Sequence, residues 1–127
     1  MNDMKELAGS LIVKNSKILL LYRKDESHWE VPGGKVKEDE SPTEAAVREA
    51  EEEIGVEVEL KKPFYTGEFQ HDGEMFLWNS YVAEITEGEP EIQENKFEEL
   101  EWIKGSELDE LELAPNLNMI LPALRKL

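Results

Sequence analysis

The sequence contains no cysteine and only two histidines. Without cysteine the chain can form no disulfide bond, and it offers no thiolate for a zinc site or for nucleophilic catalysis. His28 and His71 stand far apart in polar segments, so no histidine pair has the spacing of a metal site, and both side chains are expected on the surface. The chemistry of this chain must therefore come from other residue types.

Long apolar runs are also missing, as is a basic N-terminal segment followed by an apolar stretch. We therefore expect neither a transmembrane helix nor an export signal, and no membrane partner. The absence of cysteine agrees with a reducing compartment. Together these absences predict a cytoplasmic protein.

Positive charge is scarce: 14 Lys and Arg stand against 30 Asp and Glu, a net charge of −16. This excess argues against a nucleic-acid polymer as partner, because such partners need a basic surface. A small polyphosphate can still bind if divalent cations screen the acidic site. A length of 127 residues without repeats or linkers predicts a single domain over residues 1–127, acting as a monomer or a homodimer.

Acidic residues cluster at fixed intervals within residues 34–56. Glu49, Glu52 and Glu53 fall at positions i, i+3 and i+4, so a helix would place them on one face. Like charges this close destabilise a helix unless a cation lies against them, and a divalent ion is the simplest such cation. An ordinary solvated acidic face is the alternative, but it explains neither the flanking glycines nor the arginine at position 48.

The helix itself is well specified. Ser41 is expected as its N-cap, with Pro42 in the first turn and Glu44 placed to close a capping box. Gly55 supplies the stop, because glycine tolerates the left-handed conformation just past a helix end. An apolar stripe is expected to face the core, and it consists of Ala46, Val47, Ala50 and Ile54.

Arg48 lies four residues from both Glu44 and Glu52, the spacing at which side chains meet on a helix. We expect Arg48 to pair with these carboxylates. Its predicted role in catalysis is to orient them rather than to contact the substrate.

The pattern Gly34-x5-Glu40-x7-Arg48-Glu49-Ala50-x-Glu52-Glu53-x-Gly55-Val56 resembles the Nudix box of the Nudix hydrolases. Ala50 is a soft departure, since the family usually has a larger aliphatic residue there. The preceding segment, residues 29–34 (WEVPGG), is also similar to the lead-in of many members. The box is highly specific, and a looser resemblance covers nearly the whole chain. It implies an α/β fold, the Nudix α/β/α sandwich with a mixed β-sheet and a loop–helix–loop catalytic motif.

The resemblance also implies an enzyme, a Nudix-type pyrophosphohydrolase that acts on acid anhydrides with Mg²⁺ or, alternatively, Mn²⁺. It places the metal ligands at Glu49, Glu52, Glu53 and the backbone carbonyl of Gly33, and it gives Glu40 a role in stabilising the loop. The general base comes from either the box or a distal loop in related enzymes. We favour the box, with Glu49 or Glu52 as the base.

In relatives a distal acid often lies six residues before a tryptophan. Counting back from Trp102 gives Lys96, which departs from that pattern. Glu94 and Glu98 are the nearby substitutes, and Glu94 is the catalytic candidate because the residues before it resemble a loop of the MutT-type enzymes. A solvated loop carboxylate is the alternative for either.

Substrate contacts are implied at two places. Arg23 and Lys35 would lie near the box, where similar enzymes contact phosphate, although surface solvation is the alternative. Residues 113–118 (LAPNLN) resemble a segment of MutT-type enzymes in which an asparagine near the start of the last helix reads the purine edge. Asn116 or Asn118 is the candidate, and each is equally consistent with a helix cap.

The implied reaction is hydrolysis of a nucleoside triphosphate, natural or oxidised (for example 8-oxo-dGTP), to a nucleoside monophosphate and pyrophosphate. ADP-ribose or a nucleotide sugar is the alternative substrate. Marker residues of ADP-ribose and dinucleoside polyphosphate enzymes are not evident, because Pro63 and Tyr65 fall too early after the box. An alternative of a different class is a non-catalytic nucleotide-sensing module on the same fold.

The rest of the chain predicts strands and a few short helices. Apolar runs and turn residues indicate hairpins around residues 14–16 and around Asp72-Gly73. Ser106 is expected to cap a short acidic helix, and a last helix from Pro115 towards Leu127 should kink or start late because of Pro122. The expected strands are Leu7–Val13, Lys17–Arg23, Glu57–Leu60, Phe64–Gln70, Glu74–Ile85 and Leu100–Ile103.

Overall fold

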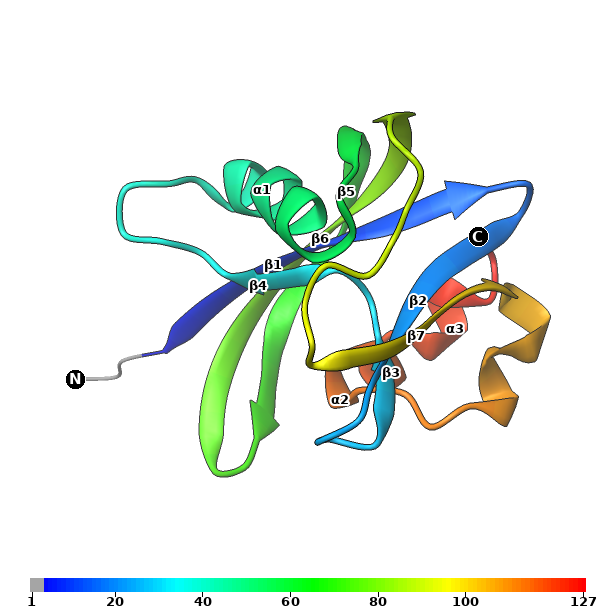
Figure 1. Cartoon of the computed structure of the whole chain (residues 1–127). Coiled ribbons are helices and arrows are strands. Elements are labelled where there is room, and N and C mark those ends of the chain that lie inside the picture. Colours follow the sequence, from blue (N-terminus) through cyan, green and yellow to red (C-terminus); the bar gives the residue numbers. More distant parts are fainter. Residues whose placement is uncertain (1–3) are drawn as a thin grey trace.

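Strand β1 (Lys5–Lys14) lies at the centre of the sheet (Figure 1). Its middle residues, 8–12, are buried on both faces. Leu11 belongs to one hydrophobic cluster and its neighbour Ile12 to another. Successive side chains of a strand point to opposite faces, so both faces of this sheet are covered. The structure is a computed structural model and describes residues 4–127.

The sheet is mixed, with strand order β3-β2-β1-β6-β5. β1 and β6 run parallel, and β4 and β7 pair antiparallel with β1 and β2, respectively. The strands other than β1 are β2 (Lys17–Arg23), β3 (His28–Glu30), β4 (Gly33–Lys35), β5 (Glu57–His71), β6 (Glu74–Glu87) and β7 (Phe97–Lys104).

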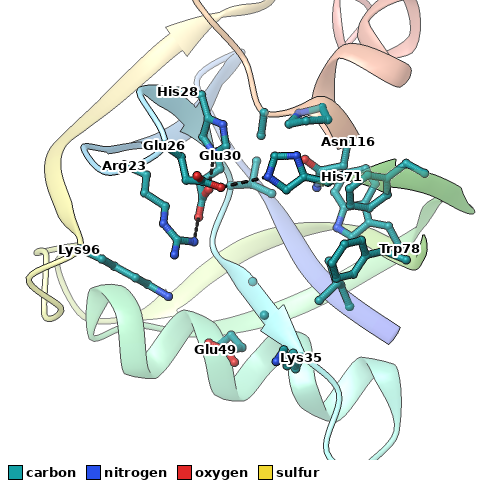
Figure 2. Close-up of a pocket in the computed structure, with 18 residues that line it drawn as sticks. Arg23, Glu26, His28, Glu30, Lys35, Glu49, His71, Trp78, Lys96 and Asn116 are labelled. Atoms are coloured by element: carbon teal, nitrogen blue, oxygen red, sulfur yellow. Dashed lines mark hydrogen bonds and ion pairs between the residues drawn. The ribbon is translucent and has the colours of Figure 1, made fainter. Parts of the chain in front are cut away.

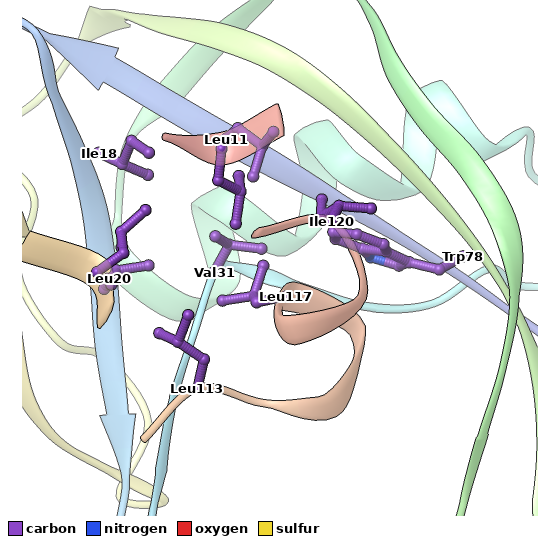
Figure 3. Packing of buried hydrophobic residues seen from close by; sticks show 10 residues of the cluster. Leu11, Ile18, Leu20, Val31, Trp78, Leu113, Leu117 and Ile120 are labelled. Carbon is purple, nitrogen blue, oxygen red and sulfur yellow. The ribbon is translucent and has the colours of Figure 1, made fainter. Parts of the chain in front are cut away.

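Helices cover the two faces and enclose two main cores. On one face, α1 (Pro42–Ile54) packs Ala50 and Ile54 against Ile12. The opposite face is covered by the C-terminal segment, whose Leu117 packs with Leu11 (Figure 3). This arrangement confirms the predicted α/β sandwich with a mixed sheet. The C-terminal elements are the 3₁₀ helix η1 (Gly105–Glu110), α2 (Pro115–Met119) and α3 (Leu121–Leu124).

Local signals fix both ends of α1 as predicted. The Ser41 hydroxyl accepts a hydrogen bond from the Glu44 N–H, and the Glu44 carboxylate accepts one from the Ser41 N–H, which completes a capping box. Such a cap stabilises a helix by about 1 kcal/mol. Gly55 ends the helix in the left-handed conformation, with φ of 70°.

The buried face of α1 differs from the prediction at one position. Val47 is 38% exposed, so its assignment to the core stripe was wrong, whereas Ala45 is fully buried. The helix is rotated on the sheet so that Glu53, also fully buried, lies on the inward face. Apolar character alone would have favoured Val47, and the packing against β1 selects the other side.

Both hairpins form where predicted. Asn15 and Ser16 have positive φ values in the first, and Asp72 and Gly73 have them in the second, as primed turns require. The segments predicted as Glu57–Leu60 and Phe64–Gln70 are one strand, β5, which continues through Pro63 with shifts in register. β3 and β4 were not predicted, because three-residue strands carry too little pattern.

The C-terminal segment corrects one prediction and confirms another. Ser106 does not cap η1, whose N-cap is Lys104, because the chain turns directly out of β7. The last helix is broken into α2 and α3, and Pro122 lies in the first turn of α3, where its missing N–H removes no helical bond. Within residues 4–127, no helix combines the length and the apolar character needed to cross a bilayer.

The exposure of Val47 and the burial of Ile54 lead to a matched pair of mutations. Ile54→Ala should lower the free energy of unfolding by about 2–5 kcal/mol, because it opens a cavity in the core. Val47→Ala should change it by less than about 1 kcal/mol. Urea unfolding followed by circular dichroism measures both, and equal losses would contradict the observed rotation of α1.

Candidate functional site

A cavity of about 460 Å³ opens beside residues 34–56, with different chemistry at its two ends (Figure 2). Charged side chains lie at one end: Arg23, Glu30, Lys35, Glu49 and Lys96. The wall also contains apolar side chains (Leu7, Val31, Phe69, Phe76 and Trp78) and the polar or ionisable side chains of Glu26, His28, His71 and Asn116. A ligand with a charged end and a flat apolar end matches this division.

Glu49 lies against the backbone of Gly34 at the charged end. A Cβ atom on Gly34 would overlap the Glu49 carboxylate, so only glycine permits this approach. Burial raises the pKa of Glu49, against the opposing effect of the nearby Arg48 guanidinium. An Arg48 nitrogen lies 3.2 Å from Oε2 of Glu49.

Glu53 has no exposed surface. Its Oε1 accepts a hydrogen bond from the Gly33 N–H at 3.0 Å, whereas its buried Oε2 has no hydrogen-bond partner. The nearest cation is the Lys96 ammonium, 3.4 Å from Oε2. Burial raises the pKa of Glu53 to about 8, although the Gly33 N–H and Lys96 oppose this shift.

These oxygens fit a divalent ion in kind. Magnesium and manganese prefer hard oxygen ligands. A buried carboxylate oxygen without a hydrogen bond is available as such a ligand. Glu52 is less well placed, since its side chain is 46% exposed and lies 3.0 Å from Arg48. Among the described residues, the three side chains whose ligand atoms converge within 4.8 Å are instead Glu26, His71 and Asp72.

Arg48 connects the loop before the helix to the acidic face of the helix. Its guanidinium makes two hydrogen bonds to Glu40, at 2.8 and 2.9 Å, and others to Glu49, Glu52 and the Lys35 carbonyl. The expected pairing with Glu52 is therefore confirmed. The expected pairing with Glu44 was wrong, because the capping box occupies that carboxylate.

Glu40 holds the loop, as expected. Its carboxylate accepts hydrogen bonds from Arg48 and from the Lys37 N–H, and these bonds lower its pKa to about 2. The loop before α1 is thus tied to the helix through one bidentate ion pair.

The other predicted site residues divide into two groups. Arg23, Lys35 and Asn116 line the cavity. Asn118 does not: its side-chain amide donates a hydrogen bond to the Leu113 carbonyl at 3.1 Å, so its contact is structural. Glu94 lies 3.4 Å from the Lys96 ammonium and is also outside the lining.

Several residues that line the cavity were not predicted from the sequence. His28 was expected on the surface, yet its side chain is only 12% exposed and lies 2.8 Å from Glu30. His71, at the end of β5, contacts Glu26 across the cavity mouth at 3.0 Å. Glu30 could have been identified from the sequence, because it stands in the segment that leads into the box. Lys96 was identified only as a departure from the expected acid.

A family model described as a NUDIX domain matches residues 4–124, nearly the whole chain. The chain belongs to the Nudix family. The Nudix box at residues 34–56 is thus the loop–helix–loop that carries Glu49, Glu53 and Arg48.

Individual relatives agree with this membership. A CTP pyrophosphohydrolase of Escherichia coli is 30% identical over 116 residues, which cover 88% of this chain and 84% of that protein. An 8-oxo-dGTP diphosphatase of Escherichia coli is 28% identical over 132 residues, covering 100% of both chains. The crystal structure of a MutT Nudix hydrolase from Burkholderia pseudomallei matches with a TM-score of 0.87 at 28% identity, covering 96% of this chain and 98% of that one.

The prediction of an enzyme of the Nudix pyrophosphohydrolase type is confirmed. Nudix hydrolases act on small nucleotide-linked substrates, and they generally use divalent metal ions.

The buried carboxyl of Glu53 predicts an unusual pH dependence of stability. Between about 4.5 and about 8 the folded chain holds a proton on Glu53 that the unfolded chain lacks, so this group makes stability fall as pH rises. Glu53→Gln should remove that loss, on the order of 4 kcal/mol across the window without metal. Thermal unfolding in EDTA from pH 5 to 8.5 measures it.

Glu52→Gln is the matched control, because it removes the same charge from the half-exposed side of the same helix. It should retain the pH dependence of the parent protein. A Glu53→Gln protein that loses stability with pH as the parent does would contradict the assigned burial effect.

Proposed function

We propose that this Nudix enzyme hydrolyses a nucleoside triphosphate, natural or oxidised, to a nucleoside monophosphate and pyrophosphate. The ion is Mg²⁺, with Mn²⁺ as an alternative. The observation that supports this most directly is the division of the cavity, in which Arg23 and Lys96 lie at one end and Trp78 and Asn116 at the other (Figure 2). The names of the two Escherichia coli relatives point the same way.

The charged end suits the triphosphate. Arg23 and Lys35 face it from the end of β2 and from β4, so they can pair with phosphate oxygens. Arg23 is already held by Asp25 at 3.0 Å and lies 3.8 Å from Glu30, which fixes the direction of its guanidinium. Lys35 follows Gly34 and so lies next to the Glu49 carboxylate.

The apolar end suits a base. Phe69 and Phe76 stack on each other with ring centroids 5.3 Å apart, and Trp78, which is only 2% exposed, also lines the cavity. Flat aromatic surfaces favour a stacked heterocycle. Asn116, beside Pro115 at the start of α2, offers a donor and an acceptor to the edge of such a base.

Four groups would hold the metal: the carboxylates of Glu49, Glu52 and Glu53 and the carbonyl of Gly33. Such an ion neutralises phosphate oxygens and lowers the pKa of a bound water. The exposed Glu52 side chain is free to turn towards the other two if its contact with Arg48 is released. Until that release, Arg48 holds both Glu49 and Glu52 through hydrogen bonds, so its role is that of a positioning residue.

We assign the general base to Glu49, with Glu52 as the alternative. Glu49 lines the cavity, and its burial raises its pKa, which makes it a better proton acceptor than an ordinary carboxylate. The distal candidate Glu94 is paired with Lys96 and lies off the cavity lining, so it is less suited to accept a proton from an attacking water.

ADP-ribose or a nucleotide sugar is the second candidate substrate, since the polar side chains of Glu26 and His71 also line the cavity and suit sugar hydroxyl groups. A non-catalytic sensing module is disfavoured because every acidic position of the Nudix box retains its carboxylate.

A turnover screen with Mg²⁺ tests the proposal directly. Triphosphates, oxidised triphosphates, ADP-ribose and a nucleotide sugar are compared by product analysis, and a triphosphate should give pyrophosphate at the highest kcat/KM. Glu52→Gln should lower kcat by about 100-fold or more while the circular dichroism spectrum stays unchanged. Full activity in that variant, or release of single phosphates only, would refute the proposed reaction.

The two asparagines separate base recognition from folding. Asn116→Ala should raise KM for the best triphosphate and reduce discrimination between bases by about tenfold, because it removes a cavity-lining amide. Asn118→Ala should instead lower the melting temperature and leave the ranking of bases unchanged, since its amide bonds the Leu113 carbonyl. A change of ranking in the Asn118 variant alone would reverse the assignment.

A further inference from the structure

Lys96 places an ammonium group between two carboxylates at the edge of the cavity. Its Nζ lies 3.4 Å from Oε2 of Glu53 and 3.4 Å from Oε1 of Glu94. The side chain extends over α1 from the loop before β7, and it also packs 5.1 Å from the centre of the Phe97 ring (Figure 2). It is 37% exposed, so it is neither fixed in the core nor free in solvent.

The Glu53 oxygen that Lys96 faces is the one without a hydrogen bond. A carboxylate with no exposed surface needs a counter-charge, and within residues 4–127 Lys96 is the cation in ion-pair range of Glu53. A divalent ion bound to that oxygen would lie within a few ångströms of the ammonium. At that separation two positive charges repel strongly in a partly buried site.

We propose that Lys96 is the resident counter-cation of this site: it faces the ionised Glu53 carboxylate before metal binds, leaves when metal binds, and then pairs with the substrate phosphates. This inference rests on the proposed function, because it takes Glu53 as a metal ligand. In this proposal the same lysine competes with the metal for Glu53 and later binds the polyphosphate.

The displaced ammonium can pair with the phosphates of a bound substrate. Lys96 lines the same cavity as Arg23 and Lys35, at the charged end that suits phosphates. A lysine carries its charge on a flexible four-carbon stem, so it can turn from Glu53 to a phosphate without moving the backbone. Glu94 lies on its other side, with Oε1 3.4 Å from the ammonium.

This arrangement predicts effects of opposite sign for metal and for phosphate. Without Lys96 the metal has no ammonium to displace, so it binds more tightly. The polyphosphate loses a cationic partner, so it binds more weakly. A lysine that only supports the fold would weaken both.

The test uses the full-length protein and Lys96→Gln. Binding of Mn²⁺ alone is measured by electron paramagnetic resonance at pH 8.5, where protons compete least for the carboxylates. The variant should bind Mn²⁺ about tenfold more tightly than the parent. Binding of inorganic pyrophosphate at saturating Mn²⁺, measured by calorimetry, should be about tenfold weaker.

Lys24→Gln is the matched control, because it removes the same charge from an exposed ion pair with Glu98, which lies near Lys96 in the chain. It should change either constant by no more than about twofold. Thermal unfolding of both variants verifies that they are folded.

The variant Glu53→Gln separates a failure of the proposed metal site from a failure of the proposed role of Lys96. If the parent binds no Mn²⁺, or if Glu53→Gln binds it as well as the parent, the proposed metal site is wrong and the inference falls with it. If Glu53→Gln weakens Mn²⁺ binding but Lys96→Gln does not strengthen it, only the role of Lys96 is overturned. Weaker binding of both Mn²⁺ and pyrophosphate in Lys96→Gln would also overturn it.

Discussion

The burial of one carboxylate, that of Glu53, is the constraint around which the site is arranged. An ionised carboxylate without solvent is unfavourable unless hydrogen bonds and cations compensate it. Here one oxygen has the Gly33 N–H, and the other faces only the Lys96 ammonium. The fold thus keeps an unfavourable group inside the helix–sheet contact, at a position where an apolar side chain would stabilise the protein more.

Two features allow this group to remain where it is. The absence of a side chain on Gly34 lets the Glu49 carboxylate lie against the backbone, so the acidic face of α1 and strand β4 come within bonding distance. Arg48 then ties Glu40, Glu49 and Glu52 into one network, which offsets repulsion among like charges. The loop, the helix and the strand are therefore held by polar contacts as much as by the apolar core.

The charged side chains of this strongly acidic chain are distributed unevenly over the molecule. Most acidic side chains are solvated on the surface, whereas the few cations of the cavity, Arg23, Lys35 and Lys96, are gathered at its charged end. These three cations stand beside Glu30 and Glu49, so the local charge of the cavity differs from the net charge of the chain. Charges in solvent interact mainly within about 10 Å, so the local charge matters more for a ligand than the total charge. Membership of the family fixes the class of chemistry, and this charge distribution bears on the substrate.

The sequence by itself determined the features that depend on neighbouring residues. These are the capping box at Ser41, the Gly55 stop and the two hairpins, since their hydrogen bonds and backbone angles lie within a few residues. The spacing of the Nudix box is also visible in the sequence, although its contacts, such as Arg48 with Glu40, join residues farther apart. Tertiary structure alone decided the rotation of α1 on the sheet, so that Glu53 is buried and Val47 is partly exposed. It also brought His28 and Lys96 to the cavity and separated Asn116 from Asn118. The physical reason is that burial and ion pairing depend on residues distant in the chain, and no local pattern records which of them will meet.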